Sequence, residues 1–218
     1  MKKRNDGFTL AEVLITLVII GVIGALTVPA LIQNTQKQEY VSALKKAYST
    51  LSQATQQIIT EEGSPKCDDG GWACTTEQIF DLYKKYIMNI KDCGTGQGCF
   101  SDGDYRDLNG YTFKMTGYGS AYHKMILSDG VSVMLDDNVF TDCSQNWYGS
   151  ENNCVHFFVD INGAKGPNTR GRDLFYFGLT PNGLVPWGCS GGWCNGEMDN
   201  GSGHGCACKV LTEGAMNY

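Results

Sequence analysis

The sequence predicts an α+β protein, in which a long N-terminal α-helix packs on a small antiparallel β-sheet with disulfide-rich loops. Three observations predict this class. An apolar run near the N-terminus continues into a polar stretch with helical periodicity. Short apolar segments separated by Gly, Asp and Asn follow, which is typical of antiparallel strands. All ten cysteines lie after residue 63.

The N-terminus combines a short basic leader, residues 1–7, with an apolar run, residues 8–32, whose only charged side chain is Glu12. A helix of this length can cross a hydrocarbon core of about 30 Å. A carboxylate well inside a bilayer costs about 2.5–3.5 kcal/mol on insertion scales. The position of Glu12 therefore needs a physical reason.

Two common interpretations of such a segment fit poorly. A secretory signal peptide has a shorter apolar core followed by a small-residue cleavage site, and a plain membrane anchor does not account for Glu12. A cut between Gly7 and Phe8 accounts for both features, because Phe8 then acquires a free α-amino group. In a packed helical bundle this ammonium group can neutralise Glu12 of a neighbouring copy, which couples burial to polymerisation.

The run GFTLAEVLITLVIIGVIGAL, residues 7–26, resembles the class III signal and N-terminal helix of type IV pilins and the related pseudopilins of type II secretion. The resemblance implies cleavage after Gly7 by a prepilin peptidase, N-methylation of Phe8 and a filament of packed N-terminal helices. Gly7, Phe8 and Glu12 match the functional residues of the family, and Pro29 falls where many such helices carry a kinking proline.

The same resemblance implies the surroundings and partners of the chain. We expect a single-pass protein of the inner (cytoplasmic) membrane whose C-terminal body lies outside the cytoplasm. It would then enter a helical filament of its own copies, at the cell surface or in the periplasm. The implied partners are a prepilin peptidase/N-methyltransferase and an inner-membrane assembly platform.

The composition argues against a general nucleic-acid-binding role. The formal net charge is −6, and loss of the leader would change it to −8 because three bases and one acid leave. Nucleic-acid binding needs a basic face. Lys37, Lys45 and Lys46 are the one local basic patch to consider, and the solvated face of a helix accounts for them as well.

Residues 33–62 predict the amphipathic half of the long helix, and residues 63–218 the globular pilin-like domain. Gly63 is the expected C-cap, and Pro65 prevents continuation of the helix. The helix face expected to pack on the body repeats at spacings of three and four, with Val41, Leu44, Tyr48, Leu51, Thr55 and Ile58.

A second, short helix is predicted from Thr76 to about Met88, because Thr75 and Gln78 form a capping box before it. Residues 91–110, rich in Gly, Asp and Cys, are expected to form an irregular loop, and residues 186–208 have no periodicity. The predicted strands are residues 111–115, 124–127, 131–135, 155–161 and 174–179, and a turn at 180–183 returns the chain through 184–185.

An even number of cysteines in a body outside the cytoplasm indicates disulfides: Cys67, Cys74, Cys93, Cys99, Cys143, Cys154, Cys189, Cys194, Cys206 and Cys208. We expect three local pairs, 67–74, 93–99 and 143–154, with the last four cysteines paired among themselves. The alternative for these last four is a zinc cluster that includes His204.

The loop from Asp160 to Asp173 allows two interpretations. Asp160, Asn162, Asn168 and Asp173 can supply oxygen ligands to calcium, and some major pseudopilins bind calcium in their C-terminal loops. Alternatively, these side chains bond backbone amides in a structural turn. Both interpretations stay open at this point.

The rest of the body indicates no enzyme. His123, His156 and His204 are scattered without a nucleophile signature, and acid pairs such as Asp136-Asp137 are typical of solvated loops. The four tryptophans either pack over disulfides or form an exposed surface for glycan or protein contacts: Trp72, Trp147, Trp187 and Trp193.

The predicted function is that of a structural subunit of a type IV pilus or a type II secretion pseudopilus. The alternatives are a minor pilin acting in adhesion or DNA uptake, and a membrane-anchored metal-binding or enzymatic domain.

Overall fold

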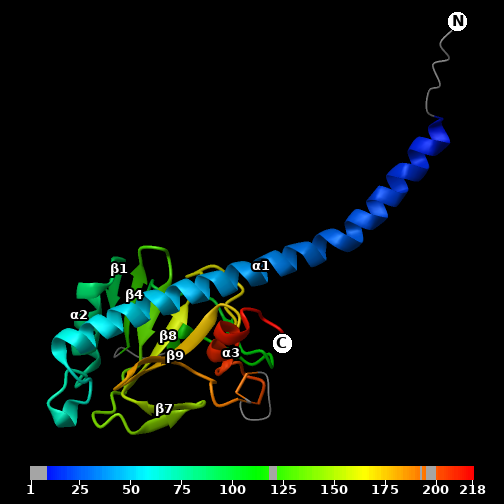
Figure 1. The fold of residues 1–218 in the computed structure, drawn as a ribbon. Coiled ribbons are helices and arrows are strands. Elements are labelled where there is room, and N and C mark those ends of the chain that lie inside the picture. The colour runs from blue at the N-terminus through cyan, green and yellow to red at the C-terminus, as the bar shows by residue number, and fades with distance from the viewer. Residues whose placement is uncertain (1–8, 118–121, 192, 195–199) are drawn as a thin grey trace, which may run out of the picture. The chain divides into compact units, whose positions relative to one another are not determined.

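The computed structural model describes residues 9–117, 122–191, 193–194 and 200–218. The chain divides into two compact units, residues 1–39 and 40–218. One helix, α1 (Leu10–Glu62), runs through both units and contains Pro29 without interruption (Figure 1). Gly63 follows α1 with a left-handed φ of 87°, and its N–H donates to the Ile59 carbonyl over 3.0 Å. The predicted long helix and its C-cap are therefore confirmed.

The second unit is built on one antiparallel sheet. Its six strands lie in the order β1 (Asn89–Gly94), β4 (His123–Leu127), β5 (Ser132–Leu135), β8 (Val155–Asp160), β9 (Leu174–Thr180) and β10 (Gly183–Pro186). The remaining elements are two short strand pairs, β2 (Tyr105–Arg106) with β3 (Thr112–Phe113) and β6 (Gln145–Trp147) with β7 (Ser150–Asn153), and the helices α2 (Thr76–Tyr86) and α3 (Cys206–Glu213). The α+β class predicted from the sequence is confirmed.

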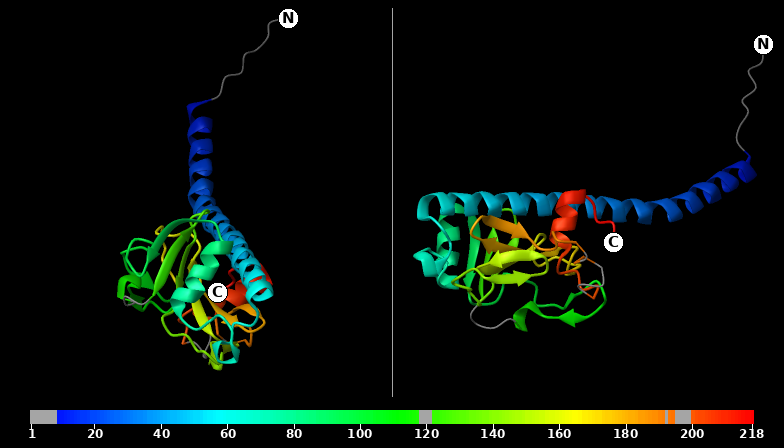
Figure 2. Two further views of the ribbon diagram at one scale, coloured as in Figure 1. Left: turned by 90° about the vertical axis from the view of Figure 1, so that its left-hand side faces the viewer. Right: turned by 60° about the horizontal axis from the view of Figure 1, so that its bottom comes forward.

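Both faces of this sheet are buried, which explains why its central strands read as continuous apolar runs. In β9, Phe175 and Phe177 join the core cluster that includes Leu44 and Leu51 of α1. Tyr176 between them points to the opposite face and joins a second cluster. Figure 2 shows residues 40–62 of α1 along one face of the sheet, so the second cluster lies on the other face.

The packing face of α1 lies where its periodicity predicts. The buried residues of the helix are Val41, Leu44, Ala47, Leu51, Ala54, Thr55 and Ile58. Tyr48 is half-buried and stacks on Phe177 with ring centroids 5.6 Å apart. The predicted N-cap of α2 is also present, since the Thr75 side chain accepts a hydrogen bond from the Gln78 amide over 3.2 Å. This helix ends at Tyr86, slightly earlier than predicted.

Two local predictions are wrong, and two further elements were not predicted. Residues 91–110 are not a loop throughout, because β1 extends to Gly94 and β2 lies within the range. The strand predicted at 111–115 is reduced to β3, because its partner β2 is only two residues long and a 3₁₀ turn begins at Met115. The polar hairpin β6–β7 and the helix α3 have no counterpart in the predicted elements.

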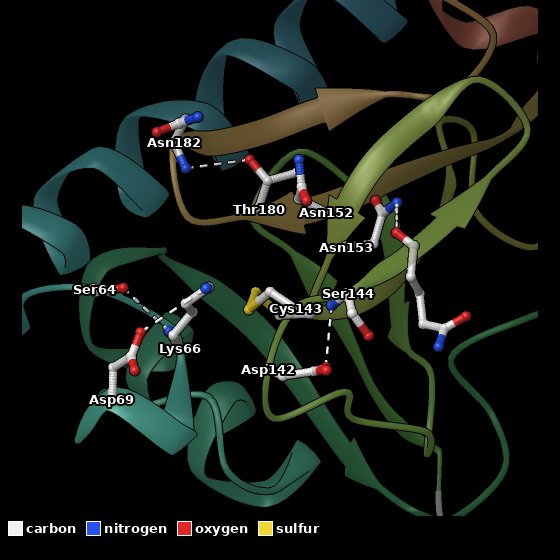
Figure 3. Close-up of a disulfide and its surroundings, with 12 residues drawn as sticks. Ser64, Lys66, Asp69, Asp142, Cys143, Ser144, Asn152, Asn153, Thr180 and Asn182 are labelled. Atoms are coloured by element: carbon white, nitrogen blue, oxygen red, sulfur yellow. Dashed lines mark hydrogen bonds and ion pairs between the residues drawn. A yellow bond between two sulfur atoms is a disulfide. The ribbon is translucent and has the colours of Figure 1, made fainter.

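The structure joins Cys67–Cys74, Cys93–Cys99, Cys143–Cys154, Cys189–Cys208 and Cys194–Cys206. These include the three local pairs expected from the sequence, and the last four cysteines pair among themselves. Figure 3 shows the Cys143 disulfide beside the hairpin residues Asn152 and Asn153. The zinc alternative is wrong, because all ten cysteines lie in the described part of the chain and none is a free thiol.

Candidate functional site

Among the expected processing and assembly residues, Glu12 lies at the start of α1 and Pro29 lies within it. Gly7 and Phe8 fall outside the described residues. Glu12 lies in the first helical turn, where its Oε2 accepts hydrogen bonds from the Thr9 amide over 2.7 Å and the Thr9 hydroxyl over 2.8 Å. The Glu12 amide in turn donates to Thr9 Oγ1 over 3.3 Å. This reciprocal arrangement is a capping box.

The capping role of Glu12 was missed in the sequence, although the spacing Thr-x-x-Glu is present from Thr9 to Glu12. Because Glu12 is the only charge in the apolar run, residues 8–32, its position was explained by a partner from another molecule, and its neighbour Thr9 was not considered. Both hydrogen bonds that the Glu12 carboxylate accepts end on Oε2, and the side chain is exposed. Glu12 can therefore start the helix and still present Oε1 to a partner from another molecule.

The segment that follows is apolar and uncovered. No side chain in residues 9–39 is buried, and Leu10, Leu17 and Leu26 are 79%, 60% and 74% exposed. Apolar surface of this extent marks contact with a membrane or another protein, because its exposure to water is unfavourable. By length and composition, α1 can cross a membrane.

Pro29 lies within this exposed segment. It has no backbone N–H, so the Ala25 carbonyl lacks the donor that a helix would normally supply. Nearby, the Thr27 hydroxyl donates to the Ile23 carbonyl over 2.9 Å. The helix continues through Pro29, so the proline weakens one step of the hydrogen-bond ladder without ending α1.

The four candidate calcium ligands come together between β8 and β9. Asp173 accepts hydrogen bonds from the amides of Asn168 and Thr169, over 2.7 and 2.5 Å, and from Asn162 Nδ2 over 3.3 Å. Asp160 accepts from the Tyr105 hydroxyl over 2.7 Å and from the Asn162 amide over 3.2 Å. The structural-turn interpretation thus accounts for part of the loop.

The turn leaves two features of this loop unexplained: two buried acids whose pKa is raised, and two buried amide oxygens without a hydrogen-bond partner. Burial raises the pKa of both acids, and the neighbouring Asp173 charge raises that of Asp160 further. The Oδ1 atoms of Asn162 and Asn168 are buried and have no hydrogen-bond partner among the described residues. Anywhere in the described residues, no group of three or more His, Cys, Asp or Glu side chains is placed to hold a metal. Any cation here would therefore depend on amide and carbonyl oxygens as well.

Comparison with known proteins concerns the N-terminal segment. The family model of the prokaryotic N-terminal methylation motif matches residues 2–28. Residues 2–28 therefore resemble the N-terminal segment that this motif describes. The chain is also 31% identical over 70 residues to the type II secretion system core protein G of Dickeya chrysanthemi. That alignment covers 32% of this chain and 46% of the relative, so the chain spans less than half the length of the protein it matches. No solved structure matches the chain.

Outside its pilin-like segment, the protein gathers side chains that appeared scattered in the sequence. His156, His204, Trp147 and Trp187 line one cavity of the body, whereas Trp72 lies elsewhere and donates to the Gly63 carbonyl over 3.0 Å. The same cavity is bordered by Asp136, whose side chain is 13% exposed and lies 3.5 Å from His156 Nδ1. The expectation of a solvated loop is therefore wrong for Asp136.

Proposed function

We propose that this protein is a structural subunit of a type IV pilus or a type II secretion pseudopilus, processed after Gly7 and polymerised through its N-terminal helix. The observation that carries the proposal is the exposure of residues 9–39. None of their side chains is buried, although the segment is apolar and its helix begins with a carboxylate. Folding of the single chain leaves this surface uncovered, and lipid or neighbouring helices would cover it.

The proposed order of membrane insertion, cleavage and assembly follows from the charge of the leader and the length of the apolar segment. The basic leader would hold the N-terminus in the cytoplasm, because cytoplasmic flanks of spanning helices are enriched in Lys and Arg. The apolar part of α1 would cross the inner membrane and place the body outside the cytoplasm. After cleavage, the α-amino group of Phe8 would meet Oε1 of Glu12 in a neighbouring copy, while Oε2 keeps the helix cap.

The proposed partners are further copies of this chain, a prepilin peptidase/N-methyltransferase and an inner-membrane assembly platform. The filament would stand at the cell surface or in the periplasm. The similarity to a type II secretion core protein supports the pseudopilus form. In either filament the role is mechanical, since the helices form the core and the disulfide-bonded body forms the wall.

The first test is intact-mass and N-terminal analysis of the protein recovered from membranes of its own cells. We expect a chain that starts at Phe8 and carries one additional methyl group. A chain that still starts at Met1, in cells with an active prepilin peptidase, would contradict the proposal.

A second test separates assembly from helix capping, since Glu12 serves both. Glu12→Ala removes the carboxylate, whereas Thr9→Ala removes the two cap bonds of the Thr9 hydroxyl and keeps the carboxylate and its bond from the amide of residue 9. We expect Glu12→Ala to abolish incorporation into sheared or cross-linked filaments and Thr9→Ala to retain it, with N-terminal processing verified in both. Equal assembly of the two variants would show that the carboxylate has no intermolecular role.

We also propose that the Asp160–Asp173 loop binds calcium. Calcium takes six to eight oxygen ligands, and each carboxylate retains lone pairs beyond those used by the turn amides. The buried Oδ1 atoms of Asn162 and Asn168 would supply two further ligands. A divalent cation would also offset the repulsion between two acids that are both fully buried.

Calcium binding has a signature in the pH dependence of stability. Because the pKa of both acids is raised by folding, the folded state binds more protons than the unfolded state above the usual carboxyl pKa of about 3.9. In chelator, the free energy of unfolding should therefore fall as pH rises through the raised pKa values. Calcium should restore it near neutral pH, by about 2.7 kcal/mol at 100 times the dissociation constant.

The measurement is thermal unfolding with calcium or chelator, at pH 7 and pH 4. Asn168→Gly is the sharpest variant, because Asn168 has a left-handed φ of 53° that glycine tolerates while losing the ligand oxygen. Asp142→Asn, at an exposed acid outside the loop, is the matched control. The proposal requires a calcium response that weakens in Asn168→Gly and persists in Asp142→Asn; an unchanged melting temperature in calcium would contradict it.

A further inference from the structure

A cavity of about 350 Å³ opens on the sheet face opposite α1. Six of its ten lining residues are Phe, Tyr or Trp, and the others are two histidines, Asp136 and Asn138. Small-molecule sites typically have volumes of about 300–1,000 Å³ and combine apolar walls with a few polar groups. Neither filament assembly nor calcium binding uses this cavity.

The aromatic wall is an ordered stack. Trp187 stacks on Tyr148 and Tyr176, with ring centroids 4.9 and 5.1 Å apart, and His204 stacks on Tyr148 at 4.6 Å. Tyr148 has a left-handed φ of 44°, which is unusual for an aromatic residue and marks a constrained position. Trp147, 42% exposed, lies beside Trp187 with centroids 6.5 Å apart. The cavity therefore has flat apolar walls and an exposed indole.

Disulfides hold the segments that carry these rings. Cys143–Cys154 connects the segment before β6, which carries Trp147, to the start of β8, which carries His156. Cys189–Cys208 joins the loop after Trp187 to α3. The disulfides thus restrain the backbone segments that carry the rings, whereas the ring side chains themselves can still shift.

The polar groups of the cavity define which ligand it suits. Asp136 is ionised near neutral pH: burial would raise its pKa, but hydrogen bonds from His156 and Asn138 outweigh burial and hold it at about 2. His156 Nδ1 is directed at Asp136, so a ring that carries one proton, on Nδ1, offers Nε2 as an acceptor. Nε2 of His156 and the indole N–H of Trp187 are both buried without a partner among the described residues.

These groups discriminate between ligand classes. The Asp136 carboxylate disfavours an anion. A quaternary ammonium ion would suit an aromatic cage, but it can neither donate to His156 Nε2 nor accept from Trp187 Nε1. A hydroxyl group can do both. A ring that carries several hydroxyls and presents C–H groups to the aromatic wall satisfies every feature of the site.

We propose that this cavity binds a neutral pyranose sugar, with its apolar ring face against the exposed indole of Trp147 and its hydroxyls bonded to Asp136, His156 and Trp187. The unpartnered His156 and Trp187 atoms are covered by neighbouring rings, so hydroxyls reach them only when these rings shift. Binding should therefore change the environment of the tryptophans. The ligand would be a neutral glycan of a surface or of the surrounding medium.

The experiment is ligand-observed saturation-transfer NMR on the full chain. The protein is kept in a polyoxyethylene detergent, because glycosidic detergents would compete for the site. The probes are the methyl glycosides of glucose, galactose and N-acetylglucosamine, with tetramethylammonium as the cationic alternative. We expect saturable binding of at least one glycoside at millimolar concentration and no stronger binding of tetramethylammonium.

Two matched variants localise the signal. Trp187→Phe keeps an aromatic ring and removes the buried N–H, and should weaken binding about fivefold, as the loss of one hydrogen bond predicts. Trp72→Phe makes the same chemical change outside the cavity and should leave the affinity unchanged. Near-UV circular dichroism verifies that both variants fold. The proposal is overturned if no glycoside binds, if tetramethylammonium binds more tightly, or if Trp72→Phe weakens binding as much as Trp187→Phe.

Discussion

The two parts of α1 differ in side-chain burial although they belong to one helix. Residues 10–39 contain no buried side chain, whereas residues 40–62 bury an apolar stripe in the core of the body. Leu17 is 60% exposed and Leu51 is fully buried. The same residue type thus stabilises the fold in one part and contributes nothing to it in the other. The apolar content of residues 10–39 is explained only by surroundings outside the chain.

The charges of the helix follow the same division. Between Glu12 and Lys37 the sequence has no charged side chain, as expected of a segment that avoids water on every side. Further along, charges lie on the outer face, where Lys46 pairs with Asp129 over 3.0 Å and keeps 64% of its side chain exposed. This exposed pairing fits a solvated helix face.

The largest expected difference between the parts comes from truncating one leucine in each. Leu51→Ala leaves a cavity in the core and should lower the free energy of unfolding of the body by about 2–5 kcal/mol. Leu17→Ala should leave it unchanged, because that side chain has no buried contacts. Chemical unfolding of the full chain in detergent, followed by near-UV circular dichroism, measures both. Similar losses in the two variants would remove the distinction between the two parts.

The second effect concerns the cross-links, which lie only in the body. Replacing Cys143 and Cys154 by serine together should destabilise the body by about 2–4 kcal/mol, because the unfolded chain gains freedom. The helicity of residues 10–39 should not change. Circular dichroism at 222 nm below the unfolding transition, compared with the melting curve, separates the two outcomes. Loss of helix before unfolding would contradict this independence.

A smaller effect is expected where α1 meets α2. Thr55 Oγ1 and the Tyr83 hydroxyl are hydrogen-bonded over 2.5 Å, and both residues are fully buried. Thr55→Val leaves the Tyr83 hydroxyl without this partner and should cost about 1–3 kcal/mol. Adding Tyr83→Phe removes the stranded hydroxyl, so the double variant should lose less than the sum of the single losses. Additive losses would show that the two hydroxyls are not coupled.

The smallest expected effect is the loss of stability when one of two threonine N-caps is removed. Thr75→Ala removes the N-cap of α2 and should lower the free energy of unfolding of the body by about 1 kcal/mol. Thr9→Ala removes the equivalent cap of α1 and should increase only the local fraying of the first turn. Amide hydrogen exchange resolves the two, since fraying accelerates exchange near residue 12 and nowhere in the body. A change in the melting temperature of the body with Thr9→Ala would contradict the comparison.

Local signals predicted much of the fold. The stripe of α1, the Thr75 cap and the hairpin between β4 and β5 each rest on residues close in sequence, so their patterns are visible without the structure. The strand β1 was missed because it lies at the sheet edge, where Ile90 is 67% exposed and backbone pairing with β4 replaces side-chain burial. Helix α3 was missed because cysteines and glycines obscure the buried spacing of Cys206 and Val210.

The sequence by itself thus determined the helix, its end at Glu62, the strands of the central sheet other than β1 and the pairing of neighbouring cysteines, because short-range periodicity and spacing encode them. Only the tertiary structure decided which distant side chains share a site. His156 and His204 meet at the cavity because His156 belongs to β8 of the sheet, and the segment before α3 brings His204 to the same cavity. The physical reason is that sheet order and disulfide closure create long-range neighbours, and a linear pattern carries no record of them.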